Sequence, residues 1–417
     1  MLRGHRRLIS RSASEAKVSR TVVLLGLTSM LTDVAAEMVV TVMPLYLVYA
    51  GHFSAAAFGF VDGIQRGAAA LVGFASAFLG DRLRRHKEVA ATGYGLSAIV
   101  KLGLATVGTA LPAIGALVLV DRIGKGIRTA PRDAMISLST PAEHLGVAFG
   151  VHRALDTTGA MLGPLLAFGI LAVAANAYTS LFFVSFCIAL VGVGILVLLV
   201  PGRETRADAG AAALVRRPVS LREALVVVRA PRFRALLVAA GALGLATASD
   251  AFVFLVLQDK LDLSLGLFPL LFVGMTSVYM LLAVPAGRLA DRIGRARVLL
   301  GGYGMLLGVY GALLAPIAGP ALIALALLLM GAYYAATDGV LAAMGSAIVP
   351  EAVRGSGLAL LNTTTGIARL LSSIAFGALW TLTGTSVAIV VFGAALLVAM
   401  ALGAVTFART REAAPHA

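Results

Sequence analysis

Twelve apolar segments, each long enough to cross a bilayer as a helix, account for most of this 417-residue chain. A helix needs about 20 mainly apolar residues to span the hydrocarbon core, where its backbone polar groups must bond to one another. The segments lie at 21–49, 54–79, 89–109, 112–137, 146–174, 178–200, 235–257, 265–286, 298–316, 320–348, 357–382 and 385–408. The sequence therefore predicts an all-α integral membrane protein with twelve transmembrane helices.

The charge pattern predicts how these helices are oriented. The chain is 59% hydrophobic and only 13% charged, with a net charge of +14 at pH 7. In a soluble protein such a charge would suggest nucleic acid as a partner, but here Lys and Arg gather in alternate connections, at 1–20, 82–87, 203–234, 288–297 and 409–411. This distribution is typical of loops on the cytoplasmic side of a membrane. We expect both termini in the cytoplasm, a location in the cytoplasmic (inner) membrane, and no nucleic-acid partner.

One long polar connection, 201–234, divides the chain near its middle. The predicted organisation is a basic N-terminus at 1–20, a six-helix bundle at 21–200, a cytoplasmic linker at 201–234, a second six-helix bundle at 235–408 and a tail at 409–417. An internal repeat supports the division, because "AFLGDRLRRHKEV" at 77–89 matches "GRLADRIGRARVL" at 287–299. Two duplicated bundles predict a solute site between them, near the middle of the membrane.

The repeated stretch resembles a loop motif of the major facilitator superfamily. "GRLADRIGRAR" follows the pattern G-x-L-A-D-R-x-G-R-[KR]-x closely, whereas Ala77 and Arg84 replace the two glycines in the first copy. The resemblance implies a gating latch, in which the Asp caps a helix and pairs with basic residues of the opposing half. The implied latch residues are Asp81, Arg82, Arg85, Gly287, Asp291, Arg292, Gly294 and Arg295.

A second stretch, "GVHRALDTTGAMLGP" at 150–164, is similar to a motif of that superfamily's antiporters. The matching positions are Gly150, Gly159, Gly163 and Pro164, but the terminal double glycine is absent. The same spacing also arises from plain helix packing. Together with "DRIGKGIRTAPRDA" at 121–134, this stretch resembles a prokaryotic branch of the superfamily whose members are mostly of unassigned substrate.

Ionisable residues inside the predicted helices are candidates for function, because a charge at the bilayer centre costs at least about 2.5–3.5 kcal/mol. Asp33 and Glu37 stand four apart on one helical face, where mutual repulsion raises the proton affinity of at least one of them. This pair predicts proton coupling; the alternative is that basic neighbours neutralise both acids. Further candidates for proton coupling are Asp62 and Asp156.

The segment 112–137 carries a charged stripe. Asp121, Lys125, Arg128 and Arg132 recur at steps of four, three and four, with Arg122 and Asp133 beside them. Such a stripe cannot face lipid, so it must line a cavity or bind carboxylates of neighbouring helices. We expect a cavity role for Arg122, Lys125 and Arg128. We also expect Pro131 to break the helix and leave Arg132 and Asp133 outside the hydrocarbon.

The remaining charges suggest ion pairs. Asp62 and Arg66 can pair within one helix. Lys101 is expected to pair with a carboxylate of 21–49 or 54–79, and Asp156 with Arg128 or Arg153. His152 is expected to be solvated, and Cys187 to be a small core residue. Other candidates for the cavity or for ion pairs are Arg153, Asp250, Asp338, Asn362 and Arg369, of which Asp338 and Arg369 can pair between adjacent helices.

These observations predict a secondary transporter. The chain shows no phosphate loop, no metal-ligand cluster and no nucleophile–base spacing, so we expect no cofactor, no metal and no enzymatic activity. The leading hypothesis is a monomeric, proton-coupled exporter that moves a small amphipathic organic solute by proton antiport and alternating access. The concentration of charge in the first half and the scarcity of Gln favour a solute with an anionic group over a sugar. The alternatives are a symporter or facilitator of an organic anion or lysolipid-like solute, a receptor that does not transport, and a channel.

Overall fold

The computed structural model describes residues 18–68, 85–201, 230–350 and 353–412, and the regular structure of these residues is helical. The first half of the chain contains α2 (Arg20–Leu45, continued by a π-helical turn Tyr46–Ala50), a helical segment at 55–68, α4 (His86–Thr106), α5 (Leu111–Leu138), α6 (Leu145–Val173) and α7 (Tyr178–Gly194, continued by a π-helical turn Ile195–Leu199). The second half contains α10 (Pro231–Leu245), α11 (Asp250–Leu261), α12 (Phe268–Ile293), α13 (Arg295–Leu314), α14 (Pro320–Ile348), α15 (Arg354–Thr383) and α16 (Thr385–Glu412).

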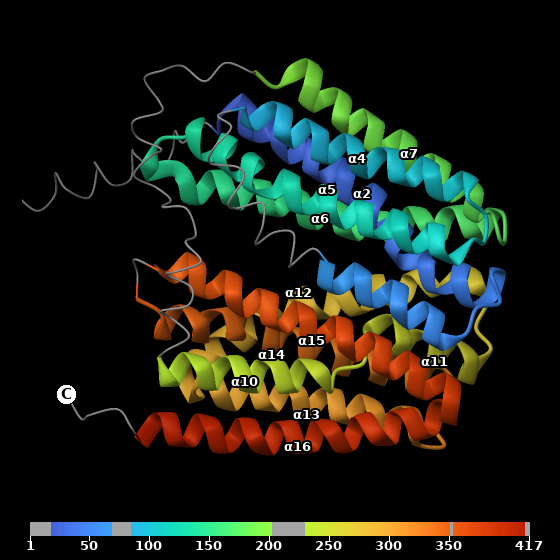
Figure 1. The fold of residues 1–417 in the computed structure, drawn as a ribbon, viewed down its shortest axis with the longest axis vertical. Coiled ribbons are helices and arrows are strands. Elements are labelled where there is room, and N and C mark those ends of the chain that lie inside the picture. Colours follow the sequence, from blue (N-terminus) through green and yellow to red (C-terminus); the bar gives the residue numbers. More distant parts are fainter. Residues whose placement is uncertain (1–17, 69–84, 202–229, 351–352, 413–417) are drawn as a thin grey trace, which may run out of the picture.

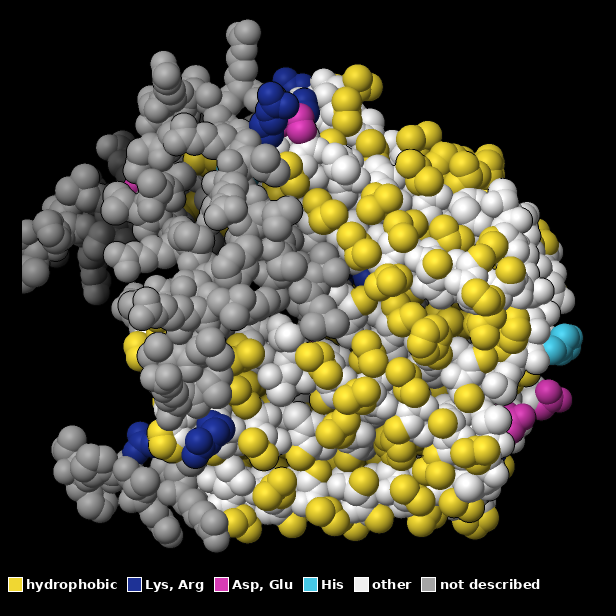
Figure 2. All heavy atoms as spheres, in the orientation of Figure 1, with side chains coloured by type: hydrophobic (Ala, Val, Ile, Leu, Met, Phe, Trp, Pro, Cys, Tyr) yellow, Lys and Arg dark blue, Asp and Glu magenta, His cyan; other side chains and the backbone are white. Residues whose placement is uncertain are grey.

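The predicted twelve-helix membrane architecture is confirmed. Within the described residues, 10 helices are long and apolar enough to cross a membrane, with α10 and α11 counted as one crossing. The charged helix α5 and the segment 55–68 provide the other two. Figure 2 shows the broad middle of one face covered mainly by apolar side chains, while Lys and Arg gather near the end where α16 terminates and acidic side chains appear at the opposite end.

The helices pack as two groups that meet at one end of the molecule (Figure 1). In the first group α2 packs on α6 and α7, and α4 packs on α5 and α7. In the second group α10 packs on α15 and α16, and α13 packs on α14 and α16. The same pairing order therefore recurs in both groups, as expected when one helical bundle has been duplicated.

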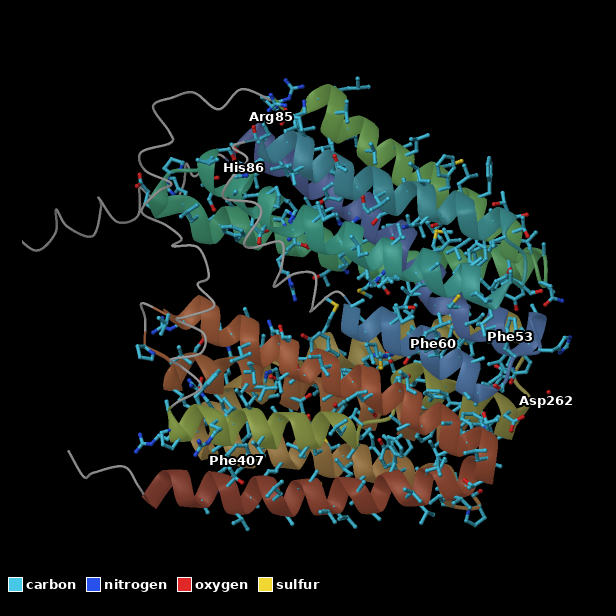
Figure 3. The ribbon with its side chains drawn as sticks, in the orientation of Figure 1. Phe53, Phe60, Arg85, His86, Asp262 and Phe407 are labelled. Carbon is cyan, nitrogen blue, oxygen red and sulfur yellow. The ribbon has the colours of Figure 1, made fainter. Side chains whose placement is uncertain are left out.

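The start of α4 and the end of α16 lie at the same end of the molecule. Figure 3 shows Arg85 and His86 at that end, together with Phe407, and Phe53 and Asp262 at the opposite end. We call the first the terminal end and the second the distal end. The two helical groups diverge toward the terminal end in Figure 1.

The groups are in close contact at the distal end, where segment 55–68 lies against α15. A Cβ atom at Gly63 would lie 2.9 Å from the backbone oxygen of Leu370. The Ala56 N–H donates to Oγ1 of Thr381 at 2.9 Å. Because the two backbones approach this closely, only residues without a side chain fit at the points of crossing. The distal end is closed by backbone packing between the two groups.

The predicted helix 235–257 is interrupted by residues 246–249, which are not helical. The exposed backbone groups bond to side chains: the Ala248 N–H donates to the Tyr310 hydroxyl at 2.7 Å, which in turn donates to the Ala246 oxygen at 3.2 Å. Oγ of Ser372 donates to the Thr247 oxygen at 2.6 Å. A broken helix is tolerated at membrane depth where neighbouring groups satisfy its backbone. The break places Asp250 at the first residue of α11.

Two sequence expectations about local structure are wrong. Pro131 does not break its helix, since α5 continues to Leu138 and keeps Arg132 half-buried among its neighbours. Cys187 is exposed on α7 rather than buried in a core, so it faces the surroundings of the bundle. Asp81, Arg82 and most of the linker 201–234 lie outside the described residues.

Candidate transport cavity

A cavity of about 280 Å³ lies between the two helical groups. Its apolar lining includes Met43, Phe58, Pro164, Phe272 and Met275, and its ionisable lining consists of Glu37, Asp62, Arg66, Arg122 and Asp250. These residues come from α2, segment 55–68, α5, α6, α11 and α12. Both helical groups therefore contribute to one chamber.

A polar cluster joins the two groups at the wall of this cavity. Arg66 Nε donates to both carboxylate oxygens of Asp62, at 3.1 and 3.0 Å, and its Nη2 bonds to Asp250 of the other group. Ser373 on α15 donates to Asp62. The predicted pair of Asp62 and Arg66 is thus present, and in addition it bridges the two groups through Asp250. We call Asp62, Arg66, Asp250 and Ser373 the cross-group cluster.

Glu37 is different from the other acids of the cavity, because its carboxylate makes no ion pair or hydrogen bond with any residue in the described part of the chain. Lys125 likewise forms no ion pair with a described residue. Glu37 lines the cavity and thus remains available to a bound solute, whereas Lys125 is not among the residues that line it.

Asp33, one turn before Glu37, is neutralised. Its Oδ1 lies 3.5 Å from Nη2 of Arg128, whose side chain is only 4% exposed. The guanidinium of Arg128 also lies over the ring of Tyr94, 4.5 Å from its centroid. Arg128 therefore stands inside the first helical group, with a carboxylate on one side and an aromatic face on the other. The expected cavity role of Arg128 does not fit this position.

The first charged residues of the α5 stripe also form ion pairs within the first helical group. Lys101 Nζ lies 3.3 Å from Oδ1 of Asp121, and Arg122 binds the other oxygen of the same carboxylate. The expectation that Lys101 pairs with an acid of 21–49 or 54–79 is therefore wrong, because α4 packs directly on α5. Arg122 also reaches the cavity, as expected, and its Nε atom is buried without a hydrogen-bond partner among the described residues.

The lower part of the stripe forms a third cluster inside the first group. Arg132 pairs with Asp133 at 3.0 Å and approaches Asp156 on α6 at 3.9 Å, and His152 Nδ1 lies 3.6 Å from the same Asp156 carboxylate. Asp156 thus pairs with neither Arg128 nor Arg153, contrary to expectation. Arg128 pairs with Asp33 instead, and Arg153 is exposed. His152 is buried, with 4% of its surface exposed, and so is not solvated.

Two charged residues of the second group, Asp338 and Arg369, lie nearer to its surface than the buried Asp250. Asp338 on α14 and Arg369 on α15 are 3.5 Å apart, so the interhelical pair suggested by the sequence is present. Asn362 and, on the first group, Arg153 are exposed. The lining of the cavity described above includes none of these four residues, Asp338, Arg369, Asn362 and Arg153.

The latch-like stretch at 287–297 is paired within its own group. Asp291, in the last turn of α12, lies 3.4 Å from Arg295 in the next helix, and Arg295 also donates to the Ala343 oxygen at 2.9 Å. Gly294 between them has a φ of +103°, which favours glycine and lets α12 end where α13 begins. The family expectation that the Asp pairs with the opposing half is not met in this conformation. Arg292 is exposed, and nothing lies within 4 Å of a Cβ placed at Gly287.

The glycines of the antiporter-like stretch have a packing role. A Cβ at Gly163 would lie 2.8 Å from the Val34 oxygen and 2.7 Å from Cβ of Glu37, and one at Gly159 would meet the Met30 oxygen. These two glycines therefore let α6 lie directly against α2, beside Glu37. Gly150 has open space around it. No group of three or more His, Cys, Asp or Glu side chains suited to a metal occurs in the part of the chain that the structure describes.

Comparison with known proteins agrees with this architecture. The family model described as the Major Facilitator Superfamily matches residues 25–280 and 251–417. An uncharacterised MFS-type transporter of Methanocaldococcus jannaschii is 28% identical over 376 residues, covering 88% of this chain and 90% of that protein. An uncharacterised protein of Mycobacterium tuberculosis is 35% identical over 159 residues, which are 38% of each chain.

Solved structures share the fold at low sequence identity. The nucleoside transporter NupG matches with a TM-score of 0.78 at 17% identity, covering 93% of this chain and 99% of that one. A bacterial homologue of the human lysosomal transporter Spinster, in an inward-facing and unoccupied conformation, matches with a TM-score of 0.67 at 13% identity, covering 94% and 97%.

Proposed function

This chain belongs to the major facilitator superfamily of secondary transporters and is not an enzyme, and from that premise we propose that it exchanges protons for a small amphipathic organic solute. In this proposal the solute moves by alternating access, outward from the cytoplasm, while protons move inward. The terminal end, which carries the basic clusters, faces the cytoplasm. The cavity described above holds the solute.

The observation that carries the proposal is the state of Glu37. Of the four acids that are candidates for coupling, Asp33, Asp62 and Asp156 each have a basic partner within 4 Å, whereas Glu37 has none among the described residues. An arginine at contact distance holds a carboxylate in its charged form. An unpaired carboxylate in a cavity of low dielectric takes up a proton more easily than a carboxylate that an arginine holds in its charged form. Glu37 is therefore the proposed proton site.

The cavity gives this site a way to couple. A solute that contacts the Glu37 carboxylate competes with the proton for it, so the transporter carries one or the other across the membrane. Competition at a single site is sufficient for antiport. The apolar walls formed by Met43, Phe272 and Met275 suit the apolar part of an amphipathic solute.

The test uses everted membrane vesicles with an imposed pH gradient reported by a fluorescent dye. The panel contains lipophilic cations, organic anions and lysolipids. We expect one solute class to collapse the gradient in vesicles with the wild-type chain and not in vesicles with Glu37→Gln. In proteoliposomes, Glu37→Gln should retain exchange of labelled for unlabelled solute, because this reaction needs no net proton movement.

Two results would contradict the proposal. If Glu37→Gln pumps as well as the wild type, Glu37 is not the proton site. If the solute enters in the same direction as the proton, the chain is a symporter, which is the behaviour expected for an organic anion that binds together with a proton. Glu88→Gln is the matched control, since Glu88 is exposed in the first turn of α4 and does not line the cavity.

A further inference from the structure

The wall of the cavity next to Glu37 contains a buried cation with unused bonding capacity. Arg122 has 9% of its surface exposed and lines the cavity, yet its Nε–H has no hydrogen-bond partner among the described residues. A buried donor without a partner is unfavourable, because it has lost its hydrogen bonds to water. An anionic group at this position would accept a hydrogen bond from Nε and remove that cost.

The local charge balance also favours an anion at Arg122. The carboxylate of Asp121 is shared by two cations, Lys101 and Arg122, so that neither is fully neutralised by it. Lys125 lies three residues further along the same helix and makes no ion pair with a described residue. Two cations therefore share the single acid Asp121, and Lys125 on the same helix adds a third positive charge that no described acid pairs with.

We infer that Arg122 and Glu37 bind the two ends of a zwitterion, with Arg122 taking a carboxylate or other anionic group and Glu37 taking an ammonium group of the same solute. The apolar body lies against Phe272 and Met275. Lys125 supports the anionic end by its charge. The inference rests on the proposed function for the role of Glu37, and it adds the charge class of the solute.

This arrangement fits exchange with protons. The ammonium group of the solute and the proton compete for Glu37, whereas the anionic end is held by Arg122 whether or not Glu37 is protonated. A solute with only an anionic group would not displace the proton. A solute with only a cationic group would leave Arg122 without its hydrogen bond.

The inference is tested by equilibrium binding to the purified full chain with three probes that share a phenyl group: phenylalanine as the zwitterion, 3-phenylpropionate as the anion and phenethylamine as the cation. We expect phenylalanine to bind most tightly to the wild-type protein. In Arg122→Gln its affinity should fall roughly 10-fold or more, to that of phenethylamine, because a hydrogen bond to a charged group is lost. In Glu37→Gln it should fall to that of 3-phenylpropionate.

Arg122→Gln should fold, because Asp121 keeps Lys101 as its partner at 3.3 Å. Arg354→Gln is the control for loss of one positive charge outside the cavity. The inference is overturned if phenethylamine binds the wild type as tightly as phenylalanine, if Arg122→Gln changes no affinity, or if none of the probes binds. This assay measures binding without a pH gradient, whereas the vesicle assay measures proton exchange. The binding assay can therefore refute the zwitterion site while the vesicle assay still supports proton exchange at Glu37, and the vesicle assay can refute proton exchange while the binding assay supports the zwitterion site.

Discussion

Replacement of Gly63 by alanine should shift the protein toward the conformation that is open at the distal end. A Cβ at this position would lie 2.9 Å from the Leu370 oxygen and 3.3 Å from a side-chain carbon of Ile374. Both contacts are on α15, in the other helical group. They exist only while the distal end is closed, so the added methyl group strains this conformation alone.

The expected size follows from the cost of overpacking. An added methyl group in a well-packed site costs about 1–3 kcal/mol, and a difference of that size between two conformations changes their ratio roughly 5- to 150-fold. Alanine also favours the helix over glycine by about 1 kcal/mol, but it does so in both conformations and cancels from the ratio.

The assay starts from a variant without native cysteine. The chain has a single cysteine, Cys187, which is exposed and can be replaced by alanine. A new cysteine is introduced as Ala251→Cys in the cavity wall, where the native side chain is 4% exposed. A membrane-impermeant maleimide added at the distal side should label this cysteine faster when Gly63 is alanine. The control is Gly194→Ala, a position with no atom within 4 Å of the added Cβ. Equal labelling in Gly63→Ala and the control would refute closure by backbone packing.

Three further predictions concern the folded state and the latch. Tyr310→Phe should lower the unfolding free energy of the purified protein by about 1–3 kcal/mol, seen as a lower melting temperature, because the buried Ala248 N–H loses its acceptor. Asp121→Asn should destabilise the protein more than Lys101→Met, because it leaves two buried cations without an acid; similar melting temperatures would contradict this pairing. Asp291→Asn should slow solute turnover with little change in solute affinity, and a large loss of affinity in a binding assay would contradict a gating role.

The sequence predicts the number and approximate limits of the helices because hydropathy over 20 residues is a strong and local signal. It does not predict the interruption at 246–249, since the apolar pattern continues through the break. One local signal was present. Ser249 followed by Asp250 is a pair typical of a helix start, and Ser249 does accept the Phe252 N–H at 3.4 Å. A helix start within an apolar segment indicates a broken membrane helix.

The partners of the intramembrane charges were harder to predict, because they depend on which helices touch. The step pattern correctly places Asp121, Lys125, Arg128 and Arg132 on one stripe, yet it leaves open whether that stripe faces the cavity or the interior of its own group. The outcome depends on the close packing of α4 on α5, which brings Lys101 to Asp121. Ser373 and Tyr310 were not identified at all, since a hydroxyl in an apolar helix carries no sign of its distant partner.

The distribution of paired and unpaired charges explains why a helix as charged as α5 can stand in a membrane and still serve transport. Its aspartates and arginines are satisfied mainly by Asp33, Lys101 and Asp156 of neighbouring helices, which holds the first helical group together as one body. Because those charges are used internally, they are not available to a solute. The groups that remain available at the cavity are the carboxylate of Glu37 and the Nε–H of Arg122. A change in protonation or in the bound ligand therefore acts on these two groups and leaves the ion pairs within the first helical group unchanged.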